Sequence, residues 1–220
     1  MKKLLIANRG EIAIRIGRTA NELGYSTIAV FPEDDAASLH VQLSDEAFQI
    51  PGEGAKAYLN IEAIINIARI SSVDAIHPGY GFLSENSEFA KACNEAEIIF
   101  VGPTHQQLDI FGNKAATRLL ANEVGVPLVP GTNGDTSLKD VINFQNQHPN
   151  KSILIKAISG GGGRGMRIVE KKEDVEKNFV RCKSEANLAF GDERVYVELL
   201  IPHARHIEVQ VVGDGRGKVT

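Results

Sequence analysis

The first hundred residues alternate between short apolar runs and segments with a helical pattern. The apolar runs, which are typical of buried parallel strands, are residues 3–7, 26–31, 46–50, 75–76 and 98–101. Between the first two runs, residues 11–23 place their apolar side chains on one side of a helix. Asn60 and Ser84 are candidate N-caps of further helices over 61–70 and 84–96. Because strand–helix–strand crossovers join parallel strands, this order predicts a doubly wound α/β domain.

The pattern changes after residue 112 to a mixture typical of an α+β domain. Two helices are predicted over 105–111 and 113–124, and a proline-containing extended segment follows them. Later helices are predicted over 137–147 and 173–190, and strands over 152–157, 165–169, 195–201 and 207–212. We therefore predict domains over 1–112 and 113–220. The last eight residues have the pattern of a turn leading into another strand, so we expect the second domain to be truncated.

Composition and charge exclude several classes of protein. A hydrophobic share of 43% and a charged share of 24% are ordinary for a globular protein. The chain contains no apolar run near the roughly 20 residues that span a bilayer, and its N-terminus lacks a signal-peptide pattern. A net charge of −4 argues against nucleic-acid binding. The two cysteines, Cys93 and Cys182, form no metal or redox motif. We expect a cytoplasmic protein without a membrane partner.

A glycine-rich loop is the densest chemical signal in the sequence. Five of the seven residues 159–165 are glycine, which suits close approach of backbone N–H groups to phosphate oxygens. The loop lies between two predicted strands and matches neither a Walker A motif nor a GxGxxG helix start. Lys156 precedes it in an apolar strand, where a cation needs an anionic partner. A surface loop without a ligand is the alternative, and Arg164 either adds a cation or points to solvent.

Other polar residues allow both a functional and an ordinary structural interpretation. Glu198, inside the apolar strand 195–201, suits a contact with an adenine amino group or an exposed sheet face. Lys114 begins a helix, where a cation opposes the macrodipole, but an isolated exposed lysine is common. The pair His203 and His206 lacks a third metal ligand. The loop 77–82 follows a strand at the edge where open α/β sheets bind ligands, or it is a rigid turn.

Six segments in this order resemble the biotin carboxylase family of the ATP-grasp superfamily, over essentially the whole chain. The segments are residues 6–13, 77–86, 100–103, 112–114, 155–166 and 205–210. The resemblance implies ATP-dependent carboxylation of biotin by bicarbonate through carboxyphosphate, with ATP and Mg²⁺ as cofactors and carrier-linked biotin as substrate. It implies a lid over residues 130–198 and a biotin entry near Tyr80 and Gly81.

The resemblance also implies a set of ATP-binding residues. Two lysines would contact phosphates, the glycines would close over them, residues 198–201 would hold adenine and a histidine would lie near the ribose. The set consists of Lys114, Lys156, Gly161, Gly162, Gly163, Arg164, Gly165, Met166, Glu198, Leu199, Ile201 and His206. Many family members have lysine in place of Leu199, so a backbone contact to adenine would survive there and a side-chain contact would not.

The partners implied by the resemblance are a biotin carboxyl carrier domain and a carboxyltransferase. Dimers in the family form through the first helix, so Arg15, Arg18 and Glu22 are candidate interface residues, with a solvated helix face as the alternative. The family's Mg²⁺ carboxylates, bicarbonate-binding arginine and catalytic base come later than residue 220. We therefore expect the 220 residues to be inactive alone. The sequence does not identify the acyl-CoA, pyruvate or urea acceptor.

Three other functions stay open at this point. Another ATP-grasp ligase, such as carbamoyl-phosphate synthetase, fits the second domain, although residues 77–86 argue against it. A non-catalytic nucleotide-binding module fits a chain without metal carboxylates. An NAD-binding oxidoreductase is suggested by the N-terminal strand–helix–strand unit alone, but residues 8–11 lack the three-glycine spacing.

Overall fold

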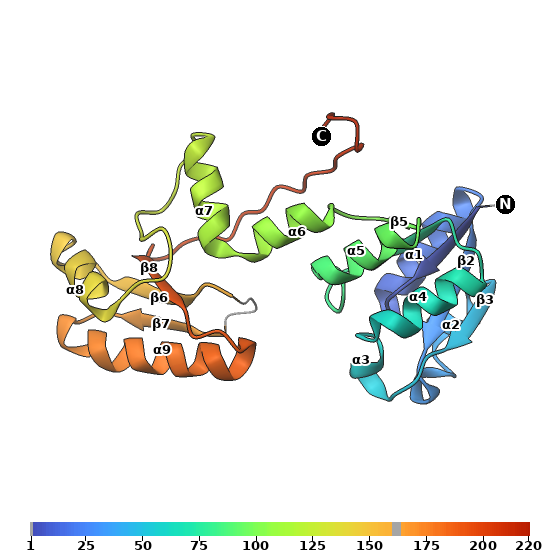
Figure 1. Cartoon of the computed structure of the whole chain (residues 1–220), viewed down its shortest axis with the longest axis horizontal. Helices are drawn as coiled ribbons and strands as arrows, with labels where there is room; N and C mark the ends of the chain where they lie inside the picture. Colours follow the sequence, from blue (N-terminus) through green and yellow to red (C-terminus); the bar gives the residue numbers. More distant parts are fainter. Residues whose placement is uncertain (1, 160–163) are drawn as a thin grey trace. The chain divides into compact units, whose positions relative to one another are not determined.

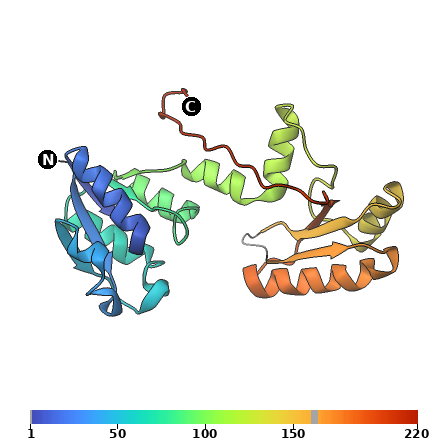
Figure 2. The same ribbon diagram turned by 180° about the vertical axis from the view of Figure 1, so that it is seen from behind.

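The computed structural model describes residues 2–159 and 164–220 of the chain. Two compact units, Met1–Thr117 and Arg118–Thr220, divide the chain within helix α7 (Lys114–Glu123). Figures 1 and 2 show the elements of each unit from opposite sides. The predicted domain boundary near residue 112 stays a prediction.

The N-terminal unit contains a five-stranded parallel sheet. Its strands are β1 (Lys3–Ile6), β2 (Ser26–Phe31), β3 (Glu46–Gln49), β4 (Ala75–His77) and β5 (Ile99–Phe100). Their order in the sheet is β3-β2-β1-β4-β5, and every neighbouring pair is parallel. The predicted doubly wound arrangement is confirmed. The order reverses between β1 and β4, and such a position is the usual ligand crevice of an open α/β sheet.

The helices of the N-terminal unit cover both faces of this sheet. Leu4 and Ile6 of β1 pack with α1 (Gly10–Glu22) in one apolar cluster. Leu5, between them in the strand, packs in another cluster with residues of α4 (Ile61–Ile70) and α5 (Ser87–Glu95). Because successive side chains of a strand point to opposite faces, α1 lies on one face and α4 with α5 on the other.

Short elements complete the N-terminal unit. The pattern did not predict η1 (Glu33–Asp35), α2 (Leu39–Gln42) or α3 (Gly54–Ala57), each of three or four residues. The helix α6 (His105–Gly112) and the start of α7 agree with prediction.

One predicted helix start was wrong. Helix α5 begins at Ser87 and not at Ser84, because the Asn86 side chain accepts a hydrogen bond from the Phe89 N–H at 2.8 Å. Residues before it form a tight turn in which the Ser84 N–H donates to the Gly81 carbonyl. Phe82 in this turn has a positive φ of 43°, which is incompatible with a helix.

The C-terminal unit has a three-stranded antiparallel sheet with two helices. Its strands are β6 (Ile153–Ala157), β7 (Met166–Val169) and β8 (Val195–Leu199), in the order β7-β6-β8. Helices α8 (Leu138–Gln147) and α9 (Val175–Phe190) supply Val141, Phe144, Phe179 and Cys182 to its apolar core. A short helix η2 (Lys172–Asp174) precedes α9. The predicted α+β pattern is confirmed for this unit.

The predicted strand over 207–212 was wrong. These residues lie in an exposed extended segment, and the Val209 side chain is 84% exposed. A strand needs a neighbour that satisfies its backbone groups, and no described strand lies beside this segment. The turn after it does form, because Val212 and Thr220 exchange backbone hydrogen bonds of 2.8 and 3.0 Å.

Within residues 2–159 and 164–220, no helix is long and apolar enough to cross a bilayer.

Candidate functional site

One face of the C-terminal sheet carries the charged residues that the sequence singled out. In β6, Ile153 and Ile155 are fully buried in the core, whereas Lys156 points to the opposite face. Lys156 stands opposite Tyr196 of β8, and Leu154 stands opposite Glu198. This register places Lys156 and Glu198 diagonally on one face.

A linked ion cluster forms on that face. Lys156 Nζ donates to Glu198 Oε1 at 2.9 Å, and Arg118 Nη1 lies 3.7 Å from Glu198 Oε2. The side chains of Lys156, Glu198 and Arg118 are 20%, 14% and 11% exposed. Water therefore screens these charges less than it screens charges on an open surface. With two cations and one carboxylate, the cluster has a net positive charge that suits an anionic ligand.

Tyr196 forms the apolar floor between the two cations. Its ring centroid lies 5.8 Å from both the Arg118 guanidinium carbon and Lys156 Nζ, within cation–π range. Burial raises the pKa of Tyr196, and the Glu198 carboxylate raises it further. Burial alone would lower the pKa of Lys156, but its hydrogen bond to Glu198 and the negative charge nearby outweigh burial, so the pKa is raised. Lys156 therefore stays protonated at neutral pH.

A loop of the same unit fixes the outer edge of β8. The Leu199 N–H donates to the Pro130 carbonyl at 2.9 Å, and the Thr132 N–H donates to the Val197 carbonyl at 2.8 Å. A Cβ on Gly131 would approach the Val197 carbonyl oxygen to 2.7 Å, so glycine is needed there. The Leu199 N–H is thus used within the protein, and its predicted backbone contact with adenine would need the carbonyl instead.

The residues around the glycine-rich loop are only partly described. Gly161, Gly162 and Gly163 lie outside the described residues. Arg164 is exposed, and Met166 stands opposite Lys156 in the register. Gly165 has a φ of +64°, and its carbonyl accepts a hydrogen bond from the Ala157 N–H at 2.8 Å.

The other described residues of the predicted ATP set lie in several elements. Leu199 is buried, and Ile201 is 55% exposed. His206 lies in the exposed C-terminal segment, where its Nε2 is 3.1 Å from Glu208 Oε1. Lys114 begins α7 directly after Asn113, whose side chain accepts hydrogen bonds from the N–H groups of residues 115 and 116. The roles of these residues toward ATP stay predictions.

The N-terminal unit brings its two candidate loops together at one sheet edge. Asn8 follows β1, and its Nδ2 donates to the carbonyls of Pro78 and Tyr80 at 2.7 and 2.8 Å. The Tyr80 hydroxyl donates to Glu11, and Tyr80 itself is 60% exposed. Gly81 next to it is exposed with a φ of +66°. The hydrogen bonds from Asn8 thus fix the backbone of this loop, while Tyr80 and Gly81 remain exposed to solvent.

Other features carry less chemistry. Arg15, Arg18 and Glu22 are exposed on α1, which fits an interface and a solvated face equally.

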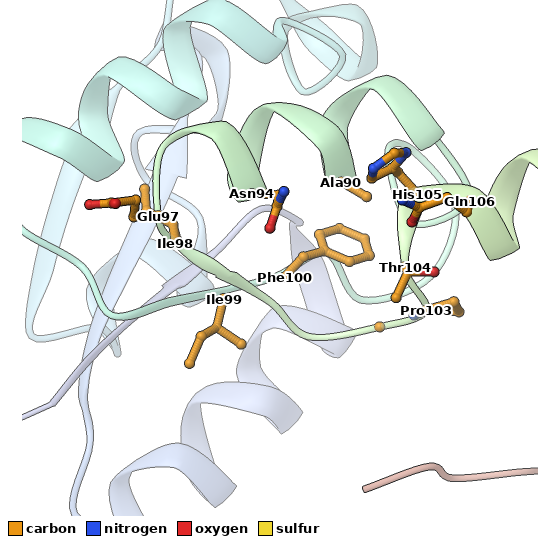
Figure 3. Close-up of a pocket in the computed structure, with 11 residues that line it drawn as sticks. Ala90, Asn94, Glu97, Ile98, Ile99, Phe100, Pro103, Thr104, His105 and Gln106 are labelled. Carbon is orange, nitrogen blue, oxygen red and sulfur yellow. The ribbon is translucent and has the colours of Figure 1, made fainter. Parts of the chain in front are cut away.

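A hollow of about 500 Å³ lies between α5 and α6, lined among others by Asn94, Phe100 and His105, and none of the predicted site residues lines it (Figure 3). Within the described part of the chain, no group of three His, Cys, Asp or Glu residues could hold a metal ion.

The sequence reasoning missed two contributors to these sites. Arg118 is an ordinary helical cation in the sequence, and only the fold reveals that it reaches β8. Asn8 is 2% exposed, and its side chain donates to two carbonyls of the loop after β4; we call this pair of hydrogen bonds the Asn8 latch. It could not be predicted without knowing that β1 pairs in parallel with β4.

Family models match almost the whole chain. The biotin carboxylase N-terminal domain model matches residues 1–108, and the ATP-binding domain model of the carbamoyl-phosphate synthase L chain matches residues 113–220.

Known carboxylases are similar over the full length of the chain. A pyruvate carboxylase of Bacillus subtilis is 50% identical over 222 residues, which are 100% of this chain and 19% of that protein. Biotin carboxylase 1 of the same organism is 43% identical over 99% of this chain and 48% of its own length. The chain thus spans about half, or less, of these relatives.

Solved structures show the same similarity. A Campylobacter jejuni biotin carboxylase in complex with beta-gamma-ATP matches with a TM-score of 0.94 and 43% identity, over 99% of this chain and 49% of that one. The biotin carboxylase domain dimer of the Hydrogenobacter thermophilus 2-oxoglutarate carboxylase, in complex with MgADP, ADP and bicarbonate, matches with a TM-score of 0.93 and 40% identity. That match covers 99% of this chain and 48% of the other.

Proposed function

Because residues 1–108 belong to the biotin carboxylase N-terminal domain family and residues 113–220 match an ATP-binding domain, we propose that the chain contributes the ATP-binding sheet of a biotin carboxylase. The complete enzyme would transfer the γ-phosphoryl group of ATP to bicarbonate, releasing ADP, and would then carboxylate biotin through carboxyphosphate. The observation that carries this proposal is the half-buried Lys156–Glu198–Arg118 cluster, whose lysine comes shortly before the glycine-rich segment in the sequence.

The cluster has the electrostatics that a nucleotide site needs. Phosphoryl transfer depends on fixed cations that stabilise charge on the phosphate oxygens. Lys156 is held on a rigid strand and stays protonated, so it can donate to a phosphate when it leaves Glu198. Met166, opposite Lys156, would pack against the base. Mg²⁺ would supply further neutralisation of the phosphate charge.

The N-terminal unit has its own proposed role in the same reaction. The Asn8 latch holds the 77–82 loop so that Tyr80 and Gly81 face outward, where biotin would enter. The proposed partners are a biotin carboxyl carrier domain, a carboxyltransferase and a second copy joined through α1. A cytoplasmic location and the identity of the carboxyl acceptor belong to the same proposal.

A lysine substitution tests the nucleotide site directly. We expect Lys156→Met to weaken ATP binding by at least tenfold, since about 1.4 kcal/mol per factor of ten is a modest value for a charge-assisted contact. The measurement is calorimetric titration of ATP into the chain. Lys151→Met is the matched control, because Lys151 is an exposed lysine just before the same strand. Equal ATP affinity in both variants would remove Lys156 from the site.

A second candidate function rests on the ATP-binding model, which is named for carbamoyl-phosphate synthase. That enzyme class also phosphorylates bicarbonate but uses ammonia as the acceptor. In the longer protein that contains this chain, free biotin should stimulate ATP hydrolysis and ammonia should not. The opposite result would favour the carbamoyl-phosphate reaction.

A further inference from the structure

Arg118 joins three parts of the C-terminal unit at the ion cluster. It lies in α7, and its Nη2 donates to the Val129 carbonyl at 2.9 Å. Its Nη1 faces Glu198 Oε2 at 3.7 Å, and its guanidinium lies over the Tyr196 ring. Its Nε is buried and has no hydrogen-bond partner among the described residues. An arginine so enclosed is held in one orientation, unlike a solvated surface arginine.

We propose that Arg118 is a positioning residue for phosphate binding, which holds Glu198 so that Lys156 can turn to a phosphate group. This inference rests on the proposed ATP site and extends it to a residue that does not itself contact the nucleotide. One carboxylate oxygen of Glu198 accepts a hydrogen bond from Lys156, and the other forms an ion pair with Arg118. When Lys156 leaves, the carboxylate keeps a cationic partner.

The cost of an unpaired buried charge explains why this partner matters. Glu198 is 14% exposed, so removal of all its cations would leave a carboxylate that water solvates poorly. Such a broken buried pair is strongly destabilising. Without Arg118, Lys156 would have to remain with Glu198, and phosphate would compete against the carboxylate for the lysine. With Arg118 in place, the exchange of Lys156 from carboxylate to phosphate leaves every charge paired.

A purely structural role for Arg118 predicts a different pattern of binding. Its hydrogen bond to Val129 also tethers α7 to the segment before the 130–136 loop. Loss of that tether would disturb the whole face and weaken every adenine-containing ligand alike. If Arg118 instead acts by positioning Glu198 and Lys156 for the phosphates, its removal weakens ATP and ADP binding and leaves adenosine binding unchanged.

The test compares ATP, ADP and adenosine in titrations of the wild-type chain, Arg118→Met and Arg118→Lys. We expect Arg118→Met to weaken ATP and ADP binding about tenfold, in the range of coupling between neighbouring charged groups, with adenosine unchanged. Arg118→Lys should restore most of the ATP affinity. Arg181→Met, at an exposed arginine of α9, is the control and should bind like wild type.

A double-mutant cycle with Glu198→Gln completes the experiment. In that background the carboxylate no longer competes for Lys156, so Arg118→Met should have no further effect on ATP binding. An equal loss for ATP and adenosine, or a full Arg118→Met effect in the Glu198→Gln background, would overturn the positioning role. If Lys156→Met loses ATP while Arg118→Met retains it, this inference fails and the proposed function stands. If the wild-type chain binds no ATP, both fail.

Discussion

At the scale of single residues, the clearest constraint is the Asn8 latch. This asparagine is buried and donates to two carbonyls of the loop after β4, at Pro78 and Tyr80. Gly79 lies so close that a Cβ there would meet Asn8 Nδ2 at 2.7 Å. The loops after β1 and β4 can therefore pack this closely only with asparagine at residue 8 and glycine at residue 79. The conformation of the loop that carries Tyr80 depends on these two residues.

Removal of the latch should destabilise the N-terminal unit. We predict that Asn8→Ala lowers the free energy of unfolding by about 2 kcal/mol, because it leaves two carbonyls without their donor. Urea denaturation followed by amide exchange in β1 measures the change. Asn94→Ala, at an exposed asparagine of α5, should change the free energy by less than about 0.5 kcal/mol. Similar effects of the two substitutions would show that the latch contributes little.

A second residue network makes the stability of this unit depend on pH. Burial would raise the pKa of Asp35, but the hydrogen bond from Tyr58 and the charge of Arg9 outweigh burial and lower the pKa below its usual value. A carboxyl whose pKa is lower in the folded state stabilises the fold above its unfolded pKa of about 4. That contribution is lost as the pH falls through the folded pKa.

Tyr58→Phe tests this dependence. The substitution removes a 2.8 Å hydrogen bond to Asp35 and should cost about 1 kcal/mol at pH 6, with a smaller difference below pH 3. Amide exchange at Ile28 and Val30 of β2 as a function of pH follows the N-terminal unit by itself. A difference between the variant and wild type that does not change with pH would contradict the assignment to Asp35.

Two of the three residues of the ion cluster could be located from the sequence. Lys156 and Glu198 could be predicted, because each is a charged residue inside an apolar strand and strand alternation gives the face. Arg118 could not be predicted, because it is far from both in sequence and lies in a helix where an arginine is ordinary. Its role depends on the contacts of its side chain with Glu198 and Tyr196 of β8, which no local pattern encodes.

At the scale of elements, capping residues decide where the helices begin and end. Asn60 was predicted as a cap, and a helix was predicted to begin at residue 137. The Asn60 and Ser137 side chains each accept a backbone hydrogen bond at the start of their helix. The predicted start at Ser84 failed because Asn86 is the stronger cap after a turn. The predicted strand over 207–212 was wrong because the alternation of apolar and polar residues indicates which side chains share a face but does not show whether a neighbouring strand is present to pair with.

The end of α9 offers a test at this scale. Gly191 adopts the left-handed conformation at φ +68°, and its N–H donates to the Asn187 carbonyl. A Cβ there would meet no other atom within 4 Å. Gly191→Ala should therefore cost about 1 kcal/mol through backbone conformation alone. Gly134→Ala, where space is equally open and φ is not left-handed, is the control. Equal stability of the two variants, measured by amide exchange in α9, would contradict this explanation.

At the scale of the whole molecule, each compact unit has a different kind of sheet. The parallel sheet of the N-terminal unit could be predicted from the regular alternation of strands and helices. The strand order of the antiparallel sheet in the C-terminal unit was harder to predict from the sequence, because the order β7-β6-β8 depends on a long connection through α9. We assign the nucleotide to the C-terminal sheet, although the N-terminal unit has the topology that often binds dinucleotides.

The most direct test of this assignment is an ATP titration of the ¹⁵N-labelled chain followed by amide chemical shifts. A nucleotide site on the C-terminal sheet predicts shifts at Leu154, Lys156, Met166 and Glu198, with no comparable change at residues 8–10 of the N-terminal sheet edge. The Lys156→Met variant should lose these shifts. Shifts confined to residues 8–10, or no shifts at saturating ATP, would contradict a nucleotide site on the C-terminal sheet.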